Sequence, residues 1–270
     1  MSVVDIIIPT KGKTDYLFKC LQSIIDNTTV PYHVHIADTG STSEEYTDIV
    51  KFLTTKFRDK KNASLYKYTY YNFAKINNDV VKNHCTNDLL LFCNNDIQLI
   101  DSCIDSMVPV AMKDGNGTVG CRLLFENGNV QHAGQVAFTH RPEGWSEDYD
   151  RLEVTHRGLN TTNRYADEES VMGNTAALMM VTRETFYLVG GFNNQYNECF
   201  EDVEFNMEVC LAGYNNIYLD SVSAIHAESV SRTKSREAIE RLLEDYNKNL
   251  VPYWVNMSEY NQKILTNFSH

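Results

Sequence analysis

The chain has 270 residues, of which 43% are hydrophobic and 11% aromatic, and this length and composition predict a globular protein with a large core. The formal net charge of −12 argues against nucleic acid as a bulk partner, because phosphate binding needs a basic face. No stretch approaches the ~18 consecutive apolar residues of a membrane-spanning helix, so we expect no integral membrane segment.

The N-terminus and the cysteines together predict a cytoplasmic location. The first residues include no basic side chain, and Pro9 ends the apolar run, so this segment lacks the pattern of a signal peptide. The seven cysteines are scattered and include no C-x-x-C pair. An odd and unpatterned set of cysteines without a secretion signal is typical of reduced thiols in the cytoplasm.

Predicted strands and helices alternate along the N-terminal part of the chain. Apolar residues at helical spacing identify the helices, and the side chain of Thr14 can cap the first of them. The predicted strands are 3–8, 33–37, 64–71 and 89–93, and the predicted helices are 14–27, 42–57 and 72–84. This alternation predicts an α/β fold in which helices flank a mainly parallel central sheet.

The pattern changes after residue 118. We predict strands at 119–125 and 130–138, joined by a hairpin turn, and then a long polar loop at 139–170 of the kind that is often functional. The remaining predicted strands are 174–181, 217–219 and 222–225, and the remaining predicted helices are 183–188, 201–211 and 235–246. Since no repeat or linker interrupts the chain, we predict one domain at 1–231 and a helical C-terminal tail at 232–270 packed on it.

Polar residues follow three of the predicted strands. Asn94-Asn95-Asp96 comes directly after the apolar run 89–93, while Thr10 and Asp38 follow the first two strands. A turn explains Asn and Asp equally well at any one of these positions. In a parallel sheet, however, the carboxyl ends of the strands share one edge, where ligands bind. The shared edge therefore predicts a ligand site, with oxygen donors that suit Mg2+ or Mn2+.

Two further groups are candidates for chemistry. Glu201-Asp202 opens a predicted helix, where acids commonly complement the helix macrodipole. The functional interpretation is a general base kept ionised by the helix N-terminus. His226 follows the last predicted strands, and a lone histidine is more often structural. As a neutral imidazole it could complete a metal site begun by Asp96.

Other catalytic patterns are missing from the sequence. It contains no G-x-x-x-x-G-K-[ST] loop, no G-x-G-x-x-G after a strand and no G-x-S-x-G elbow. His132, His140 and His156 lack the spacing of zinc ligands.

Taken together, these segments resemble glycosyltransferase family 2, the inverting GT-A enzymes, and within it the rhamnosyltransferase-like branch. The resemblance covers about residues 3–232. The segments that carry it are Asp5-Ile-Ile-Ile-Pro-Thr-Lys-Gly-Lys-Thr-Asp-Tyr-Leu17, Ala37-Asp-Thr-Gly-Ser-Thr42, Tyr71-Asn-Phe-Ala-Lys-Ile-Asn-Asn78, Leu90-Leu-Phe-Cys-Asn-Asn-Asp96, Val119-Gly-Cys-Arg-Leu-Leu124, Val130-Gln-His-Ala-Gly134, Val189-Gly-Gly-Phe-Asn193, Phe200-Glu-Asp-Val-Glu204 and His226-Ala-Glu-Ser229. Each segment is weak alone, and their order and spacing make the resemblance specific.

The resemblance implies a GT-A fold and a set of site residues. The donor-binding residues that it implies are Pro9, Thr10, Asp38, Asn72, Lys75, Asn77, Asn94 and Asn95. Asp96 and His226 are the implied ligands of Mn2+ or Mg2+, and Asp202, next to Glu201, is the implied catalytic base. The first position of the family's Asp-x-Asp motif is Asn94 here, which removes one formal charge near the cation and leaves open whether Asn94 contacts metal or donor.

The resemblance implies transfer of a hexose from a UDP- or dTDP-sugar to a hydroxyl of a glycan or glycolipid acceptor, as in polysaccharide biosynthesis. We assign Trp145 and Asn174 to acceptor binding, although Trp145 suits a buried anchor as well as a sugar-stacking platform. One alternative is a binding module that holds a sugar nucleotide or glycan without transfer, motivated by Asn94. Another is a nucleotidyltransferase, although the chain lacks a glycine-rich basic phosphate loop near its start.

Overall fold

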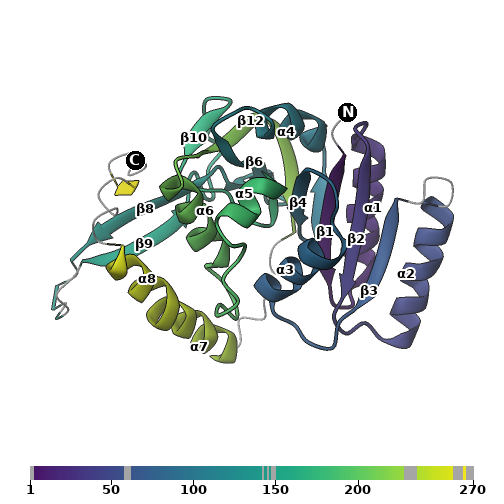
Figure 1. Cartoon of the computed structure of the whole chain (residues 1–270), viewed down its shortest axis with the longest axis horizontal. Helices are drawn as coiled ribbons and strands as arrows, with labels where there is room; N and C mark the ends of the chain where they lie inside the picture. Colours follow the sequence, from purple (N-terminus) through teal and green to yellow (C-terminus); the bar gives the residue numbers. More distant parts are fainter. Residues whose placement is uncertain are drawn as a thin grey trace.

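The computed structural model describes residues 3–57, 62–141, 143–144, 146, 150–227, 236–257 and 264–265. A ten-stranded sheet forms the centre, a separate two-stranded sheet lies beside it, and a helical segment at 236–256 follows them in the sequence (Figure 1). Within these residues, none of the helices combines the length and the apolar composition needed to cross a bilayer. Trp145 lies outside the described residues.

The N-terminal half of the central sheet is parallel, as predicted. Its strands are β1 (Val4–Thr10), β2 (Tyr32–Asp38), β3 (Ala63–Lys67) and β4 (Leu89–Cys93), in the order β4-β1-β2-β3, and its helices are α1 (Thr14–Asn27), α2 (Ser43–Lys56) and α3 (Phe73–His84). Thr10 is in register with Asp38, and Ile7 is in register with Phe92. The polar residues that follow these strands therefore share one edge of the sheet.

The C-terminal half of the sheet is mixed and continues in the order β10-β12-β6-β11-β4. Its elements are β5 (Ile97–Leu99), α4 (Cys103–Ala111), β6 (Asn116–Leu124), β7 (Val130–His132), β10 (Glu169–Val171), β11 (Leu178–Thr182), α5 (Arg183–Leu188), α6 (Glu201–Leu211) and β12 (Asn215–His226). β11 runs antiparallel to both of its neighbours, whereas β12 runs parallel to β6. The sequence patterns did not predict β5 or α4.

The segment 130–171 differs most from the prediction. The expected strand 130–138 is split into β7 and β8 (Gln135–His140) at Gly134, whose φ of 97° lies in the left-handed region. β8 pairs with β9 (Arg151–His156) in the separate sheet, so 139–170 is not one loop. Both strands of this ribbon are partly exposed. Polar residues are tolerated at the exposed positions, so the segment lacks the apolar pattern by which a strand is recognised in the sequence.

Two smaller predictions were also wrong. The two short strands expected at 217–225 form the single strand β12, with a register shift against β6 between Leu219 and Ser223. The polar pair Asp220-Ser221 interrupts the apolar run at this irregularity without ending the strand. Thr14 does not cap α1, because Lys13 occupies the N-cap position at φ 52° and no side chain caps this helix.

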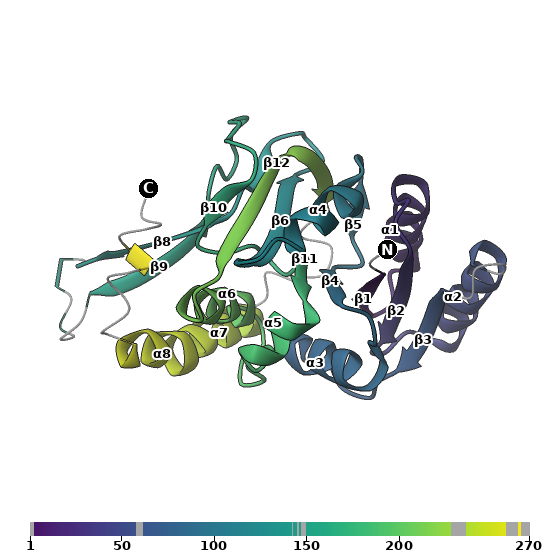
Figure 2. The same cartoon turned by 45° about the horizontal axis from the view of Figure 1, so that its top comes forward.

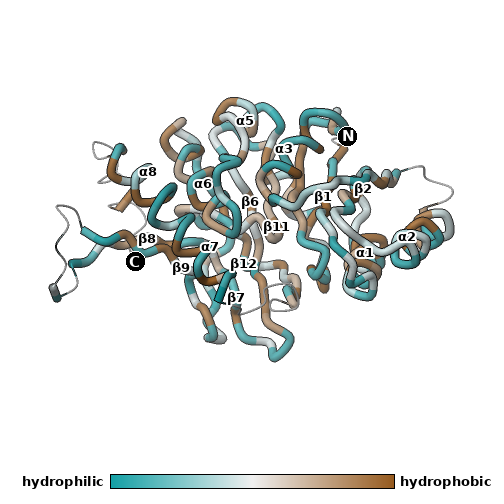
Figure 3. The backbone as a smooth tube through the Cα atoms, turned by 90° about the horizontal axis from the view of Figure 1, so that it is seen from below, coloured by the Kyte–Doolittle hydropathy of each residue, from teal (hydrophilic) through white to brown (hydrophobic). Residues whose placement is uncertain are grey.

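Helices cover both faces of the central sheet (Figure 2). One apolar cluster joins β1, β2 and β4 to α1 and α4, and a second joins the other face to α3, α5 and α6. Hydrophobic residues are concentrated along the central strands (Figure 3). The C-terminal helices α7 (Arg236–Asp245), η1 (Tyr246–Leu250) and α8 (Val251–Asn256) reach a third cluster, in which Leu250 and Trp254 join Val203 and Met207 of α6.

Asp5 is a buried carboxylate near the start of β1. It accepts hydrogen bonds from the backbone N–H groups of Thr86 and Asn87, each at 2.9 Å, and its Oδ1 lies 2.9 Å from His35 Nε2. Burial alone would raise the pKa of Asp5, but the donors from His35 and Asn87 outweigh it and the pKa is lowered. The carboxylate therefore joins β1, β2 and the start of β4 as an anion.

Within the described parts of the chain, one group of at least three His, Cys, Asp or Glu residues offers closely spaced ligand atoms. It consists of Asp5, His35 and Cys85, whose ligand atoms all lie within 4.8 Å of one another. Both carboxylate oxygens of Asp5 already accept hydrogen bonds, and burial raises the pKa of the Cys85 thiol well above its usual range. A protonated thiol beside a satisfied carboxylate indicates a structural cluster.

Replacing Asp5 with Asn should lower the free energy of unfolding at pH 7 by about 2 kcal/mol, because hydrogen bonds to a buried charge are lost. The pKa of Asp5 is lower in the folded state, so its contribution is complete above the unfolded pKa of about 3.9. The contribution is lost as the pH falls through the folded pKa. Urea unfolding of both proteins between pH 7 and pH 3 should show the difference narrowing; a difference independent of pH would contradict this prediction.

Candidate active site

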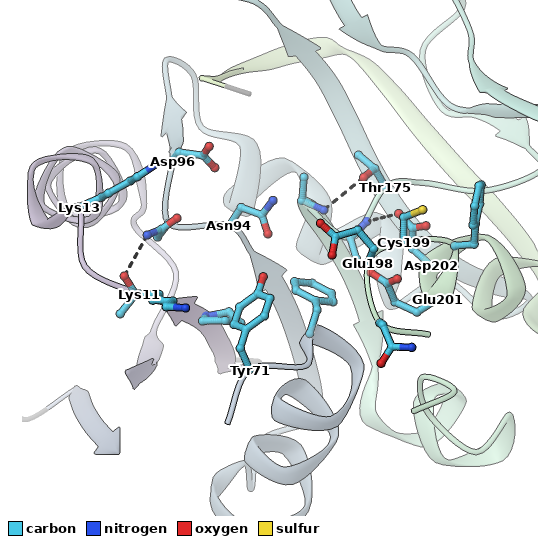
Figure 4. Close-up of a pocket in the computed structure, with 18 of the residues that line it drawn as sticks. Lys11, Lys13, Tyr71, Asn94, Asp96, Thr175, Glu198, Cys199, Glu201 and Asp202 are labelled. Atoms are coloured by element: carbon cyan, nitrogen blue, oxygen red, sulfur yellow. Dashed lines mark hydrogen bonds between the residues drawn. The ribbon is translucent and has the colours of Figure 1, made fainter. Parts of the chain in front are cut away.

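A pocket of about 780 Å³ opens at the carboxyl edge of β1 and β4, opposite the N-terminus of α6 (Figure 4). This volume is within the range of small-molecule sites. The residues that line it are Pro9, Thr10, Lys11, Lys13, Tyr16, Tyr71, Phe73, Asn94, Asn95, Asp96, Thr175, Ala176, Ala177, Asn197, Glu198, Cys199, Phe200, Glu201, Asp202 and Arg241. Figure 4 shows Asn94 and Asp96 on one side of the space and Thr175, Glu198 and Asp202 on the other.

The side of the pocket near β1 carries polar groups and cations. Asn95 Nδ2 donates to Thr10 Oγ1 at 2.9 Å, and this bond joins the loops after β1 and β4. Lys11 and Lys13 line the same side from the turn before α1. Two ammonium groups beside oxygen ligands suit a ligand with a diphosphate, because both the cations and a bound metal would offset its charge.

Asp96 lines this side of the pocket, and His226 contacts it from a position outside the lining. His226 Nε2 lies 3.2 Å from Asp96 Oδ1 and 3.4 Å from Asn94 Nδ2, and His226 Nδ1 lies 2.6 Å from Gln131 Oε1. Gln131 Nε2 donates to the His226 carbonyl, and this second contact fixes which end of the amide faces the ring. Because Gln131 Oε1 can only accept, Nδ1 carries a proton.

This arrangement fits a metal ion. In the neutral imidazole the lone pair is on Nε2, so Nε2 and Asp96 Oδ1 are two acceptors 3.2 Å apart. A second proton on His226 or a cation held by both atoms relieves their repulsion. A metal-bound histidine usually donates its other N–H to an acceptor, and Gln131 is in that position. Asp96 and His226 are therefore suitable ligands for Mn2+ or Mg2+.

Asp202 lies on the opposite side, in the first turn of α6. Its Oδ2 accepts a hydrogen bond from the Ala176 N–H at 3.0 Å. The neighbouring residue Glu201 also lines the pocket. Phe200 precedes the helix with φ 78°, a left-handed conformation that is unfavourable for a side chain of this size. The strained backbone of Phe200 therefore lies at the pocket, directly before the carboxylates of Glu201 and Asp202.

The segment 174–177 connects the two sides of the pocket. The Ala177 carbonyl accepts from the Asn94 N–H at 2.8 Å, while the Ala176 N–H holds Asp202. Asn174 is fully buried beneath this segment and lies outside the pocket lining. Its Nδ2 donates to Thr118 Oγ1 at 3.1 Å. The structure therefore places Asn174 in the support of the site and away from its surface.

Asn206 ties α6 to the same segment. Its Oδ1 accepts from the Asn174 N–H at 3.1 Å, and its Nδ2 donates to the Asp202 carbonyl at 2.6 Å. A Cβ at Gly120 would clash with the Asn174 side chain, and a Cβ at Gly173 would lie 2.5 Å from Asn206 Cβ. Glycine is required at both positions because these asparagines occupy the space beside the backbone.

Asp38 and Asn77, two of the expected donor-binding residues, are buried and lie outside the pocket lining. Asp38 accepts from the Ser41 N–H at 3.0 Å, within the turn that follows β2. Asn77 donates to the Phe73 carbonyl one turn earlier in α3.

Asn72 and Lys75 are also outside the lining. Asn72 caps α3 by accepting from the Lys75 N–H at 2.8 Å, and its Nδ2 donates to the Tyr196 carbonyl at 2.7 Å. The Lys75 ammonium lies 3.3 Å from Asp79 and 3.9 Å from the centre of the Tyr70 ring. The neighbouring aromatic residues Tyr71 and Phe73 face the pocket instead.

The sequence reasoning missed several residues of the site. Gln131 and Tyr71 are part of segments that carried the family resemblance, but no role was assigned to them. The loop 197–199 and Arg241 had no recognisable signal, because their place in the pocket depends on contacts between distant segments. No described residue of 139–170 lines the pocket. The β8–β9 ribbon lies at the end of the molecule opposite β3 and α2 (Figure 1).

Solved structures with a similar fold are glycosyltransferases. A mannosyltransferase from Pyrobaculum calidifontis, PcManGT in complex with GDP-Man and Mn2+, is similar with a TM-score of 0.63 and 16% identity, over 95% of this chain and 64% of that one. GalNAc-T7 with UDP, GalNAc and Mn2+ is similar with a TM-score of 0.71 and 12% identity, over 97% of this chain and 50% of that one. The expected GT-A fold is confirmed.

Two curated proteins are similar in sequence, and both are much longer than this chain. The O-antigen biosynthesis protein RfbC of Myxococcus xanthus is 31% identical over 241 residues, which are 85% of this chain and 18% of that protein. The uncharacterized protein y4gI of Sinorhizobium fredii is 28% identical over 233 residues, or 85% of this chain and 25% of that protein.

The family comparison covers both the sheet edge and most of the residues around it. The model of the family described as glycosyl transferase family 2 matches residues 5–187. This match includes Thr10, the Asn94-Asn95-Asp96 segment and the connecting segment 174–177. The chain belongs to glycosyl transferase family 2.

Proposed function

We propose that the chain is a metal-dependent inverting glycosyltransferase that moves a hexose from a nucleotide-sugar to a hydroxyl of a glycan or glycolipid acceptor. The observation that carries the proposal is the pocket itself, with Asp96 on one side and Asp202 on the other. His226 lies 3.2 Å from Asp96, just outside the pocket lining. We further propose UDP- or dTDP-sugars as donors and a cytoplasmic location. Free thiols at all seven cysteines support the location.

The neighbouring structures support the donor class and the cation. Their names include GDP-Man with Mn2+ in one case and UDP with Mn2+ in the other. In this chain Asp96 and His226 would hold the cation, which, when bound, supplies the charge that stabilises a departing diphosphate. Lys11 and Lys13 add positive charge on the same side of the pocket.

The protein's own groups account for an inverting transfer in one displacement. The acceptor oxygen forms a bond to the anomeric carbon while the bond from that carbon to the diphosphate oxygen breaks. The acceptor proton passes to the Asp202 carboxylate, which the Ala176 N–H holds in position. Each bond formed is matched by one broken, so no covalent intermediate with the protein is needed.

A binding module without transfer is the second candidate, and Asn94 in place of an acidic residue favours it. The Asn94 amide faces His226 and adds no negative charge to the cation site. Against this candidate, the proposed base Asp202 and the proposed metal ligand Asp96 line one pocket, and His226 lies 3.2 Å from Asp96. The first two predictions below include a measurement of turnover, which a binding module lacks, and the third tests the metal site.

Calorimetric titration with UDP-, dTDP- and GDP-sugars should show binding of one nucleotide class, with affinity at least about tenfold higher in Mn2+ than in EDTA. The physical reason is that a cation on Asp96 neutralises part of the diphosphate charge. The same donor should be hydrolysed or transferred slowly when Mn2+ is present. Equal affinity with and without Mn2+ would contradict the metal dependence.

Replacing Asp202 with Asn should lower kcat by roughly 10² to 10⁴-fold, the usual contribution of a positioned general base. The Kd of the donor should change little, because Asp202 lies across the pocket from Asp96. The matched control is Glu184→Gln, which removes an exposed acid from the first turn of α5, away from the pocket. Retained turnover in a folded Asp202→Asn variant would exclude Asp202 as the catalytic base.

Replacing Gln131 with Leu should weaken Mn2+ binding by roughly 10- to 100-fold, because the partner that orients the His226 ring is lost. Gln131→Glu keeps an acceptor facing Nδ1 and should restore most of the affinity. Direct titration of Mn2+ in the presence of the nucleoside diphosphate measures the effect without relying on turnover. Equal Mn2+ affinity in the Leu and Glu variants would count against this role for Gln131.

A further inference from the structure

We propose that the C-terminal helix α7 is a working part of the active site: Asp245 positions the loop 197–199 beside the base, and Arg241 contacts the acceptor. The role of Arg241 rests on the function proposed above, whereas the role of Asp245 depends on contacts alone. Helix α7 would then complete the site of the preceding domain.

Asp245 is fully buried at the C-terminal end of α7. Its carboxylate accepts from three consecutive backbone N–H groups, those of Asn197 at 3.0 Å, Glu198 at 2.6 Å and Cys199 at 3.2 Å. Successive N–H groups that converge in this way form an anion-binding nest. Here the anion comes from a residue 46 to 48 positions further along the chain, so these bonds fix the loop to α7.

The loop that Asp245 holds leads directly into the catalytic helix. Asn197, Glu198 and Cys199 all line the pocket, and the next residue is Phe200 with its left-handed backbone. Such a conformation is retained only when the surroundings enforce it. The Phe200 ring also lies 6.0 Å from the ring of Tyr246, the residue after Asp245. The C-terminal segment thus supports both the loop and the strained residue that precedes Asp202.

Arg241 is one helical turn before Asp245, so both side chains are on the same side of α7. Arg241 Nε donates to Glu198 Oε2 at 3.0 Å, and both residues line the pocket. The guanidinium therefore lies on the side of the pocket that carries Glu201 and Asp202, away from the cation ligands. A planar group with several N–H donors at this place suits the hydroxyl oxygens of a sugar acceptor.

The role of Asp245 is tested by hydrogen–deuterium exchange of the full chain. Asp245→Asn should raise exchange at the amides of 197–199 by at least about tenfold, because a charged acceptor of three N–H groups is lost. The matched control is Glu244→Gln, which removes the adjacent charge, paired with Lys248 on the surface. Unchanged exchange at 197–199, or an increase equal to that of the core strands, would contradict the proposed role of Asp245.

The role of Arg241 is tested by measuring the acceptor KM and the affinity for the nucleoside diphosphate separately. Arg241→Gln should raise the acceptor KM by about tenfold, the factor that ~1.4 kcal/mol represents, while the Kd of the nucleoside diphosphate with Mn2+ stays within about twofold. Arg236→Gln is the matched control, since Arg236 is on the same helix and pairs with Glu240 outside the pocket. Weaker nucleotide binding, or an unchanged acceptor KM, would overturn the acceptor contact.

The two arms separate failure of this inference from failure of the proposed function. A wild-type chain that transfers no sugar to any acceptor refutes the proposed function and with it the acceptor role of Arg241. The exchange measurement still decides whether Asp245 holds the loop, because it needs neither donor nor metal. Active wild-type protein with an unaffected Arg241→Gln variant refutes only the inference.

Discussion

The segment 174–177 holds the two halves of the pocket at a fixed separation. Its Ala177 carbonyl accepts from the Asn94 N–H, and its Ala176 N–H donates to Asp202. The proposed displacement needs Asp96 and Asp202 at a fixed separation, because groups that act on one reacting centre must be held in the right geometry. Two backbone hydrogen bonds from neighbouring residues set it here, and the remaining support of the site acts on this segment or on the helix that it contacts.

The support consists largely of buried amides. Asn206 binds both Asn174 and the first turn of α6, and Asn174 in turn reaches Thr118 of β6. Amide side chains can donate and accept at once, so they join backbone groups that point in different directions without placing a net charge in the core. Glycines at 120 and 173 are needed for the same reason, because the amides lie directly against the backbone.

The cation side is supported by different chemistry. Gln131 accepts from His226 and leaves the other ring nitrogen facing Asp96, so one neutral side chain sets the geometry of a charged site. Asn94 leaves the usual acidic pattern at this place, and its amide faces the same ring nitrogen. Among the described side chains of this cluster, Asp96 is therefore the one that offers a cation a negative charge. Neutral His226 offers the lone pair of its ring nitrogen.

Local sequence patterns determined the alternating strands and helices, the shared edge on which Thr10 and Asp96 lie, and α6 with Asp202 in its first turn. Periodic burial and strand-end polarity are properties of short segments, so they can be read without knowing the neighbours. The split at Gly134, the β8–β9 ribbon and the burial of Asn174 were decided only by the tertiary structure. The same holds for Gln131 behind His226 and Asp245 beneath the loop 197–199, because each contact joins segments far apart in the chain, and only packing determines which distant polar groups satisfy one another.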